Sequence, residues 1–318
     1  MESKKKITIL SACYNEQENI RPLYETVKNI MAEFPQFEYE QIFADNCSTD
    51  RSAEIMEEIA AQDKNIKVVL NLRNYGPNRS GLNILRLASG DAVISMASDF
   101  QDPPEMIAKF VEKWAEGNKI VWGQRTNNNG KRGLGWLRKL YYRLIKMISE
   151  SEEFVGCTGF GIYDKEVVDW IRWMDDPEPY VRNEVTALGY RPVLIPFEQQ
   201  KRRAGKSSYN FMRYFDEAVI SMVASSRKPL RFVTYLGLFS AMVSILVAAI
   251  YLILKLSNWY NFNAGMAPLV IGLFFLGAVQ LICLGVVGEY IGAILLRVKK
   301  RPIVIARKMI NFDSDQRK

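Results

Sequence analysis

The run ITILSACYNEQENI, residues 7–20, decides the fold, because an apolar β-rich segment passes directly into a polar cluster and a helical pattern. The same order recurs along the amino-terminal half of the chain. We predict strands at residues 7–13, 39–45, 66–72, 91–97 and 119–125. We predict helices near residues 17–33, 50–62, 78–88 and 103–116. This alternation is typical of an α/β domain whose mostly parallel sheet is wound by right-handed crossover connections.

Polar clusters follow three of these strands, at the ends where open α/β sheets bind their ligands. The clusters are YNEQEN, NCSTD and SDFQD, and they include Tyr14, Asn15, Glu16, Asp45, Asp99, Gln101 and Asp102. Oxygen ligands of this kind suit Mg²⁺ or Mn²⁺ bound together with substrate phosphates. Asp50 and Asp102 are alternatively helix caps, with Pro103 in a first helical turn. The pattern predicts one ligand crevice where the three clusters converge.

Composition narrows the chemistry that this chain can perform. It has 318 residues, a formal net charge of +7 and no histidine. The length fits one large soluble domain plus a small membrane part. Without histidine, a histidine base, a histidine–metal site and a Ser-His-Asp triad are excluded. The four cysteines show no CxxC spacing, which favours reduced cytosolic thiols, and MESKKKITIL lacks the apolar core of a signal peptide.

Two uncharged runs, residues 232–254 and 256–288, are each long enough to cross a bilayer as a helix. Residues 201–231 hold eight Lys and Arg, and residues 297–308 hold six and no acid. Because the connector SNWYNFNAG carries no cation, the positive-inside rule predicts that both ends are cytoplasmic and residues 257–265 lie outside. Cations beside spans favour anionic lipid head groups over a nucleic-acid partner.

Three further segments have two interpretations each. The Gly- and Asn-rich residues 127–135 form either a lid over the site or an ordinary surface loop. Residues 211–223 carry an apolar stripe at helical spacing, which fits either an interfacial helix or a buried core helix. In the second run, Gly288 and Gly292 permit close helix approach. Glu289 between them is either a paired functional acid or a snorkelling side chain.

The pieces CYNEQENI (13–20), ADNCSTD (44–50) and SDFQDPPE (98–105) together resemble the family-2, GT-A-type glycosyltransferases. TGFGIYDKEVVD (158–169), RRAGKSS (202–208) and GEYIG…KKRP (288–302) are similar to the polyisoprenyl-phosphate glycosyltransferases, in their bacterial bactoprenol glucosyltransferase branch. The resemblance implies a GT-A domain at residues 1–210 with a two-helix transmembrane hairpin. We accordingly expect an interfacial helix at 211–229, two spans within 230–296 and a basic cytoplasmic tail at 297–318.

The resemblance also implies roles for individual residues. The nucleotide would be contacted by Tyr14, Glu16, Asp45 and Asn46, and a Mg²⁺ or Mn²⁺ ion would be held by Asp99 and Gln101. The lipid phosphate would be held by Arg125, Arg202, Arg203, Lys206 and Ser207, with Asp99, Arg125 and Arg202 catalytic; any one of these cations is alternatively an ordinary surface charge. The sequence departs from the family motifs at Asn46, Cys47, Ala97 and Ser208. Because the family motif has an acid where this chain has Ala97, we predict fewer protein ligands to the metal ion. Asn46 could still form hydrogen bonds to the ribose or the base, but it carries no charge.

The predicted reaction is inverting transfer of a hexose, glucose from UDP-glucose in the first instance, to undecaprenyl phosphate. A lipid monophosphate with a second pKa of ~6 needs no general base, which agrees with the missing histidine. One alternative is transfer of another sugar, such as mannose or an aminopentose, to the same lipid. The other is a membrane scaffold whose degenerate site no longer catalyses transfer. A processive polysaccharide synthase is disfavoured, because further spans and a QxxRW segment are missing. We also expect a homo-oligomer, membrane lipids as partners and no nucleic acid.

Overall fold

The computed structural model describes residues 4–126, 154, 156–174, 185, 188–200, 228–257, 266–299 and 302–313. The chain divides into two compact units, which we describe separately. The sheet unit comprises residues 1–135, 151–209 and 300–318, and the hairpin unit comprises residues 136–150 and 210–299.

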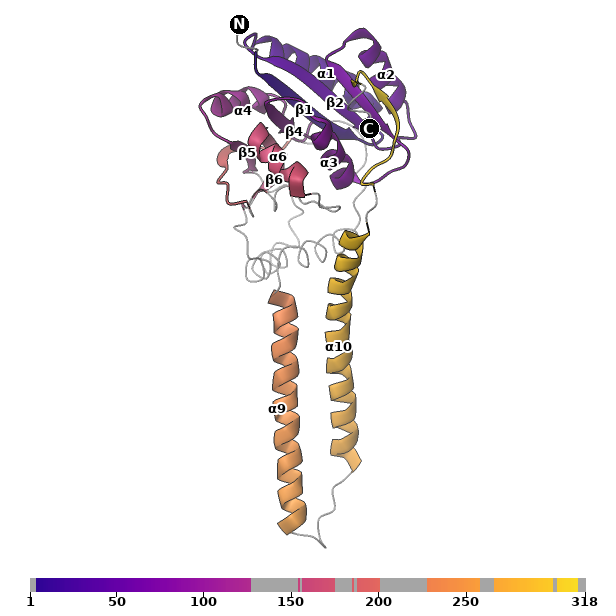
Figure 1. Cartoon of the computed structure of the whole chain (residues 1–318), viewed down its shortest axis with the longest axis vertical. Coiled ribbons are helices and arrows are strands. Elements are labelled where there is room, and N and C mark those ends of the chain that lie inside the picture. The colour runs from indigo at the N-terminus through magenta and orange to yellow at the C-terminus, as the bar shows by residue number, and fades with distance from the viewer. Residues whose placement is uncertain are drawn as a thin grey trace. The chain divides into compact units, whose positions relative to one another are not determined.

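The sheet unit is built on an eight-stranded mixed sheet with the order β7-β5-β6-β4-β1-β2-β3-β8 (Figure 1). The strands are β1 (Lys6–Cys13), β2 (Glu38–Asp45), β3 (Ile66–Asn71), β4 (Ala92–Ser95), β5 (Ile120–Arg125), β6 (Cys157–Asp164), β7 (Val193–Phe197) and β8 (Ala306–Ile310). All five strands expected from sequence are present. The pairs β1–β2, β1–β4 and β2–β3 are parallel, as the alternation predicted, and β5 is also parallel to β7, a strand that was not predicted.

The antiparallel strand β6 was not predicted, and it separates β4 from β5. Its sequence CTGFGIYD gives little periodic signal, because two of its eight residues are glycines. A Cβ built on Gly161 would lie 2.2 Å from the carbonyl oxygen of Val121 on β5. Only glycine therefore lets β6 approach β5 this closely.

Four of the helices in the sheet unit lie where the sequence indicated, and a fifth, α6, was not predicted. They are α1 (Gln17–Ala32), α2 (Ser52–Gln62), α3 (Pro77–Leu87), α4 (Met106–Ala115) and α6 (Lys165–Met174). Asp50 acts near a helix start, since its Oδ1 accepts a hydrogen bond from the backbone N–H of Ser52 at 3.0 Å. The cap expected at Asp102 is wrong: α4 begins four residues later, and Pro103 precedes it in a turn.

Apolar side chains are buried on both faces of the sheet, because successive strand residues point to opposite sides. On one face, Ile9 and Phe43 pack against α1, α2 and α4. On the other, called the α3 face here, Leu10 and Ile42 pack against α3 and α6. Figure 1 shows α1 and α2 on one side of the strands and α3 and α6 on the other.

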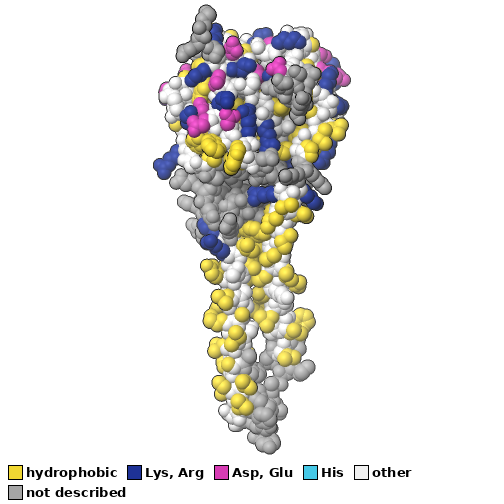
Figure 2. Space-filling view, in the orientation of Figure 1, with side chains coloured by type: hydrophobic (Ala, Val, Ile, Leu, Met, Phe, Trp, Pro, Cys, Tyr) yellow, Lys and Arg dark blue, Asp and Glu magenta, His cyan; other side chains and the backbone are white. Residues whose placement is uncertain are grey.

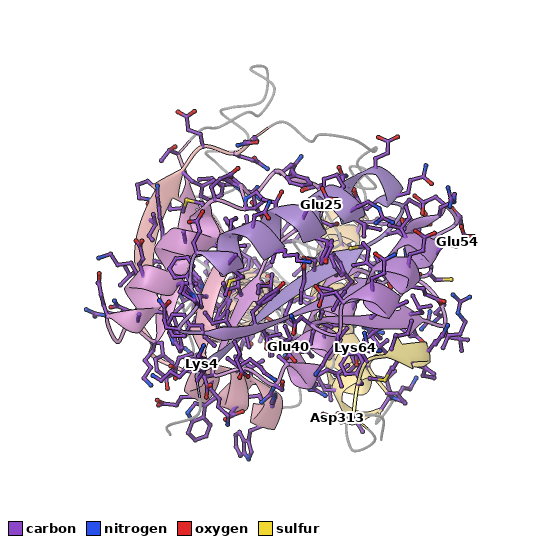
Figure 3. The ribbon with its side chains drawn as sticks, turned by 90° about the horizontal axis from the view of Figure 1, so that it is seen from above. Lys4, Glu25, Glu40, Glu54, Lys64 and Asp313 are labelled. Carbon is purple, nitrogen blue, oxygen red and sulfur yellow. The ribbon has the colours of Figure 1, made fainter. Side chains whose placement is uncertain are left out.

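The predicted basic tail does more than carry charge, because its residues 306–310 form the edge strand β8 antiparallel to β3. Asn311 follows β8 and donates hydrogen bonds to the carbonyl oxygens of Ala60 and Ile66 at 2.7 Å each. Lys64 in turn donates to Asn311 Oδ1 at 3.2 Å, and Figure 3 shows Lys64 close to the chain's last described residues. The sheet unit is thus completed by chain that follows the hairpin.

The hairpin unit contains α9 (Lys228–Ser257) and α10 (Met266–Val298). Both are long and apolar enough to cross a membrane, over residues 228–254 and 272–295. Figure 2 shows hydrophobic side chains along both helices. The division agrees with the predicted connector at residues 257–265, since α9 ends at Ser257 and α10 begins at Met266. A Cβ on Gly288 or Gly292 would meet nothing within 4 Å among the described residues, so close packing at this motif stays a prediction.

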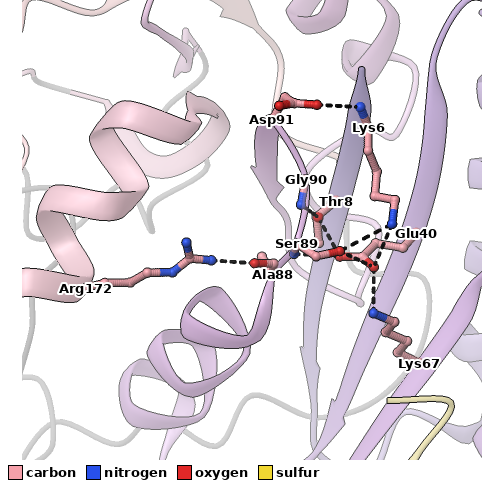
Figure 4. A network of polar contacts seen from close by, with 9 residues as sticks. All are labelled: Lys6, Thr8, Glu40, Lys67, Ala88, Ser89, Gly90, Asp91 and Arg172. Atoms are coloured by element: carbon pink, nitrogen blue, oxygen red, sulfur yellow. Dashed lines mark hydrogen bonds and ion pairs between the residues drawn. The ribbon is translucent and has the colours of Figure 1, made fainter. Parts of the chain in front are cut away.

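A buried ion pair fixes the strand ends opposite the polar clusters (Figure 4). Glu40 on β2 accepts hydrogen bonds from Thr8 Oγ1 and from Ser89 N, both at 2.8 Å, and pairs with Lys67 Nζ at 2.8 Å. Lys6 Nζ lies 4.0 Å from Glu40 Oε2. Burial opposes ionisation of Glu40, but the hydrogen bonds from Lys67, Ser89 and Thr8 outweigh it and hold its pKa below the ordinary value.

Replacing this carboxylate should make the fold less stable at neutral pH. In Glu40→Gln, Lys67 loses its counter-ion, and we expect a loss of about 2–4 kcal/mol in unfolding free energy. Because the folded pKa is depressed, the stabilisation is present above about pH 4.3 and disappears as the pH falls through the folded pKa. Wild type and variant should therefore converge in melting temperature at acid pH. Glu25→Gln, at an exposed position on α1, is the matched control, and an equal effect there would contradict the account.

Candidate active site

The three polar clusters lie at the carboxyl-terminal ends of β1, β2 and β4. We call this end of the sheet the carboxyl edge. Cys13 is paired with Asp45 across β1 and β2, and Leu10 is paired with Ser95 across β1 and β4. Beyond the strands, Asn46 N donates to the Cys13 carbonyl at 2.9 Å. The predicted convergence of the clusters is confirmed by this register.

The first two clusters interlock through their turns. The Asn15 N–H donates to Ser48 Oγ at 2.9 Å, and Asn15 Oδ1 accepts from the Thr49 N–H at 2.8 Å. The Glu16 N–H donates to Ser52 Oγ at 2.9 Å. Asn15 adopts a left-handed backbone with φ of 56°, a conformation that asparagine tolerates better than most residues. The turn after β1 and the turn after β2 therefore hold each other in place.

Two carboxylates predicted to contact a nucleotide are buried here. Asp45 is 1% exposed, and both its oxygens accept from the Ser48 N–H, at 3.1 and 3.2 Å. Glu16 is 8% exposed and accepts from Asn19 Nδ2. Cys13 lies near these carboxylates. Burial raises the pKa of its thiol, and the negative charges of Glu16, Asp45 and Asp50 raise that pKa further. Negative charge is therefore concentrated at the carboxyl edge.

Asn46 is engaged within the protein. Its Oδ1 accepts from Asn71 Nδ2 at 3.2 Å and from the Tyr75 N–H at 2.9 Å, while its Nδ2 donates to Asn74 Oδ1 at 3.0 Å. Asn74 Oδ1 also accepts from the Gly76 N–H at 2.9 Å. The amide that replaces the usual second acid thus supports the loop between β3 and α3.

The third cluster forms a tight loop after β4. Asp99 is 6% exposed, and its Oδ1 accepts from the Gln101 N–H at 3.1 Å. The side chain of Gln101 accepts from Gln199 Nε2 at 2.9 Å, and its carbonyl accepts from the Gln200 N–H at 3.1 Å. This loop therefore holds the chain that follows β7, directly ahead of residue 201.

Asp102 forms an ion pair instead of a helix cap. Arg125 Nη2, at the end of β5, lies 3.0 Å from Asp102 Oδ1. Burial raises the pKa of Asp102, the negative charge of Asp99 adds to the rise, and Arg125 only partly offsets it. Arg125, predicted to hold a phosphate, is thus anchored by one of its nitrogens. Its Nε is buried and has no partner in the described part of the chain.

The donor set suits a hard divalent cation completed by substrate. The described residues contain no group of three His, Cys, Asp or Glu side chains that could bind a metal by themselves. Asp99 contributes a carboxylate and Gln101 an amide oxygen, both hard oxygen ligands. Mg²⁺ and Mn²⁺ are commonly bound through one or two such groups plus phosphate oxygens, so the residues present fit this kind of ion.

Several predicted site residues lie outside the described part of the chain. They are Arg202, Arg203, Lys206 and Ser207, and the same holds for residues 127–135 and 211–223. Sequence reasoning missed the Asp102–Arg125 pair and the role of Gln199 and Gln200. The short β-rich run VLIPF, residues 193–197, was the signal that could have placed these glutamines at the site.

Comparisons with known proteins identify the family of this chain. Residues 8–172 match the family model "Glycosyl transferase family 2", and residues 228–294 match the model "GtrB C-terminal hairpin". The chain therefore belongs to glycosyl transferase family 2 and is a glycosyltransferase with a GT-A-like mixed sheet. Its carboxyl-terminal helices form the hairpin typical of GtrB proteins. The predicted fold, enzyme class and family resemblance are confirmed.

Individual relatives match over nearly their whole length. A bactoprenol glucosyl transferase of Shigella phage SfII is 32% identical, over 95% of this chain and 98% of the relative. The uncharacterized glycosyltransferase YkcC of Bacillus subtilis is 30% identical, over 96% of this chain and 95% of the relative. The solved mannosyltransferase PcManGT of Pyrobaculum calidifontis, in complex with GDP-Man and Mn²⁺, is 15% identical with a TM-score of 0.47, over 94% of this chain and 89% of that chain.

Restoring the usual acid at position 46 should weaken the fold. In Asn46→Asp, a carboxylate oxygen would face Asn74 Oδ1, which cannot turn away without losing the Gly76 N–H. We expect the unfolding free energy to fall by about 1–3 kcal/mol, measured by chemical or thermal unfolding. Asn29→Asp, at an exposed position on α1, is the control for added charge. Unchanged or greater stability of Asn46→Asp would contradict the assigned network.

Proposed function

We propose that this glycosyltransferase transfers glucose from UDP-glucose to undecaprenyl phosphate at the cytoplasmic face of a membrane, with inversion at the anomeric carbon. The observation that carries the proposal is the interlocked set of acids and amides at the carboxyl edge of a family-2 domain. The hairpin and the bactoprenol glucosyl transferase relatives support the lipid acceptor and the glucose.

The donor would occupy the carboxyl edge. Glu16 and Asp45 are held rigidly by the interlocked turns, and Tyr14 is partly exposed beside them. Such pre-positioned groups can orient a nucleotide without a large entropic cost on binding. Asn46 would act on the nucleotide mainly by supporting the loop between β3 and α3, because most of its hydrogen-bonding capacity is used there.

Asp99 and Gln101 would hold Mg²⁺ or Mn²⁺, which supplies positive charge to the departing diphosphate. Asp99 would be the main carboxylate that anchors the cation, since position 97, where the family motif has an acid, is an alanine. Gln199 donates to the amide oxygen of Gln101 and so fixes the direction of the lone pair that remains.

An oxygen of the acceptor phosphate would attack the anomeric carbon of glucose, and the bond from that carbon to the UDP oxygen would break. The acceptor is already ionised, so no side chain needs to remove a proton. Arg125, whose side chain is 26% exposed, would help to hold the acceptor through the accessible part of its guanidinium group, together with Arg202, Arg203, Lys206 and Ser207 from the segment after Gln200. Rate enhancement would come from position and electrostatics.

We further propose that both termini are cytoplasmic and that the protein is a homo-oligomer. The cations beside both apolar helices support this orientation. We also propose four segments: a catalytic domain at residues 1–210, an interfacial helix at 211–229, two transmembrane helices within 230–296, and a basic tail at 297–318 that contains strand β8.

Removing the proposed metal carboxylate should abolish transfer. With purified full-length protein, labelled UDP-glucose, undecaprenyl phosphate and Mn²⁺, we expect Asp99→Ala to lose at least ~100-fold in kcat, because the diphosphate leaves uncompensated. Excess EDTA should have the same effect on wild type. Asp313→Ala is the matched control, because Asp313 follows β8 at the opposite edge of the sheet. Near-normal transfer by Asp99→Ala would contradict the proposal that Asp99 holds the metal ion.

The acceptor assignment is tested with kinetics in which both substrates are varied. Arg202→Ala should reduce kcat/KM for undecaprenyl phosphate by roughly ten- to a hundred-fold, since a charge-assisted hydrogen bond to phosphate contributes ~1.5–3 kcal/mol. Binding of UDP-glucose should change little. If the variant instead weakens UDP-glucose binding and spares the lipid, Arg202 acts on the donor diphosphate.

A further inference from the structure

Asn71, the last residue of β3, carries a side-chain amide that is buried on the α3 face. It lies on that face because Val69, two residues earlier in the strand, packs there. The Asn71 Nδ2 donates hydrogen bonds to Asn46 Oδ1 at 3.2 Å and to Ser80 Oγ at 3.1 Å. The Asn71 Oδ1 is buried and has no partner among the described residues, and a buried acceptor without a partner costs stability. An apolar side chain would avoid this cost, so we attribute the amide to the two groups that it joins.

The two partners of Asn71 hold the loop at residues 72–76, which we call the β3 loop. Asn46 Oδ1 also accepts a hydrogen bond from the Tyr75 N–H within this loop, at 2.9 Å. Ser80 lies in the first turn of α3, the helix that follows the loop. One buried amide therefore connects the end of β3, the predicted nucleotide contact Asn46 and the start of α3.

Strand β8 fixes the end of β3 from the edge of the sheet. Leu70 is paired with Lys308, but the next residue, Asn71, is paired with Ala306, so Arg307 is an extra residue in a β-bulge. In a regular ladder, Arg307 would be opposite Asn71. The bulge instead brings Ala306 to this position, and Ala306 packs against the apolar cluster of the α3 face. A small side chain, rather than an arginine, is therefore paired with Asn71.

Contacts at both ends hold β8 in the sheet unit. At its start, the Leu72 N–H donates to the Ile305 carbonyl at 2.9 Å. Beyond its end, Phe312 is buried, and the centre of its ring lies 5.2 Å from Lys67 Nζ. Such cation–π contacts are stronger when they are shielded from water. Strand β8 therefore restrains the end of β3, from which Asn71 reaches Asn46.

We propose that Asn71 and strand β8 position the donor site: β8 holds the end of β3, and Asn71 then holds Asn46 and the β3 loop in the arrangement that binds the nucleotide. This inference rests on the donor placement in the proposed function. Asn71 is buried and would touch no substrate, so it is a positioning residue that acts through Asn46 and the loop. Because coupling between sites is reciprocal, a nucleotide bound at the carboxyl edge must in turn stabilise the start of β8.

Nucleotide binding to the full-length protein tests the role of Asn71. UDP and GDP are each titrated with Mn²⁺ by calorimetry into wild type, Asn71→Leu and Thr8→Val. Leucine has a similar volume but no donor, so fewer molecules would hold the β3 loop in place, and we expect nucleotide affinity to fall by roughly tenfold. Thr8→Val removes a buried hydrogen bond to Glu40 at the opposite ends of the strands, and it should leave affinity unchanged. Equal affinity of wild type and Asn71→Leu, or an equal loss in Thr8→Val, would overturn the proposal.

Testing two nucleotides separates this proposal from the proposed function. If wild type binds GDP but not UDP, the proposed donor is contradicted, whereas the comparison of variants with GDP still tests the positioning. If wild type binds neither nucleotide, both proposals are overturned.

Transfer kinetics distinguish positioning from a loss of folded protein. A variant that is partly misfolded has a lower kcat and an unchanged KM, because its folded molecules are normal. For Asn71→Leu we expect KM for UDP-glucose to rise by roughly tenfold, while kcat and KM for undecaprenyl phosphate change little. A lower kcat with an unchanged KM for UDP-glucose would assign Asn71 to stability alone and overturn the proposal.

Hydrogen exchange of the wild-type protein tests the role of β8 and remains decisive if Asn71→Leu does not fold. When the nucleotide binds, the backbone amides of residues 72–76 and 303–307 should exchange more slowly, since both segments are stabilised together. The amides of α6, which begins after the last residue of β6, serve as the control and should not change. Protection of residues 72–76 without residues 303–307 would overturn the role of β8. Unchanged exchange in both segments would overturn the whole proposal.

Discussion

The parallel pairing of β1 with β2 and β4 is the constraint on which the site depends. Because Cys13 is opposite Asp45 and Leu10 is opposite Ser95, three loops leave the sheet at the same edge. The buried Glu40–Lys67 pair lies near the other ends of these strands and penalises any shift of one strand past another. A register slip would move every polar cluster and turn buried side chains to the wrong face.

The loops at this edge are connected to one another as well as to the sheet. Asn15 and Ser48 tie the first turn to the second, and Asn46 ties the second to the loop after β3. Gln101 ties the third to the chain after β7. Positioning of this kind suits a reaction in which the acceptor is already charged and the protein mainly orients it. The sequence contains no histidine, and the proposed reaction needs none.

Much of this arrangement could be predicted from local sequence. The strand–loop–helix pattern located five strands, four helices and the three clusters, because period-two apolar runs and turn residues lie close together in the chain. Strands β6, β7 and β8 escaped prediction, since β6 is rich in glycine, β7 is only five residues long, and β8 follows two membrane-type helices. The same limit applies to Asp102: its proximity to Pro103 suggested a cap, whereas its partner Arg125 is 23 residues away in sequence. Partners that the fold brings together leave no local signal.

The mass of the lipid product tests the central claim most directly. Purified full-length protein would be incubated with undecaprenyl phosphate, Mn²⁺ and an equimolar mixture of UDP-glucose, UDP-GlcNAc and GDP-mannose, and the lipid fraction would be weighed by intact mass spectrometry. The account predicts one new species, undecaprenyl phosphate carrying a single hexose, which disappears when UDP-glucose alone is omitted. Binding of UDP-glucose without any glycosylated lipid, or a product that requires one of the other donors, would contradict it.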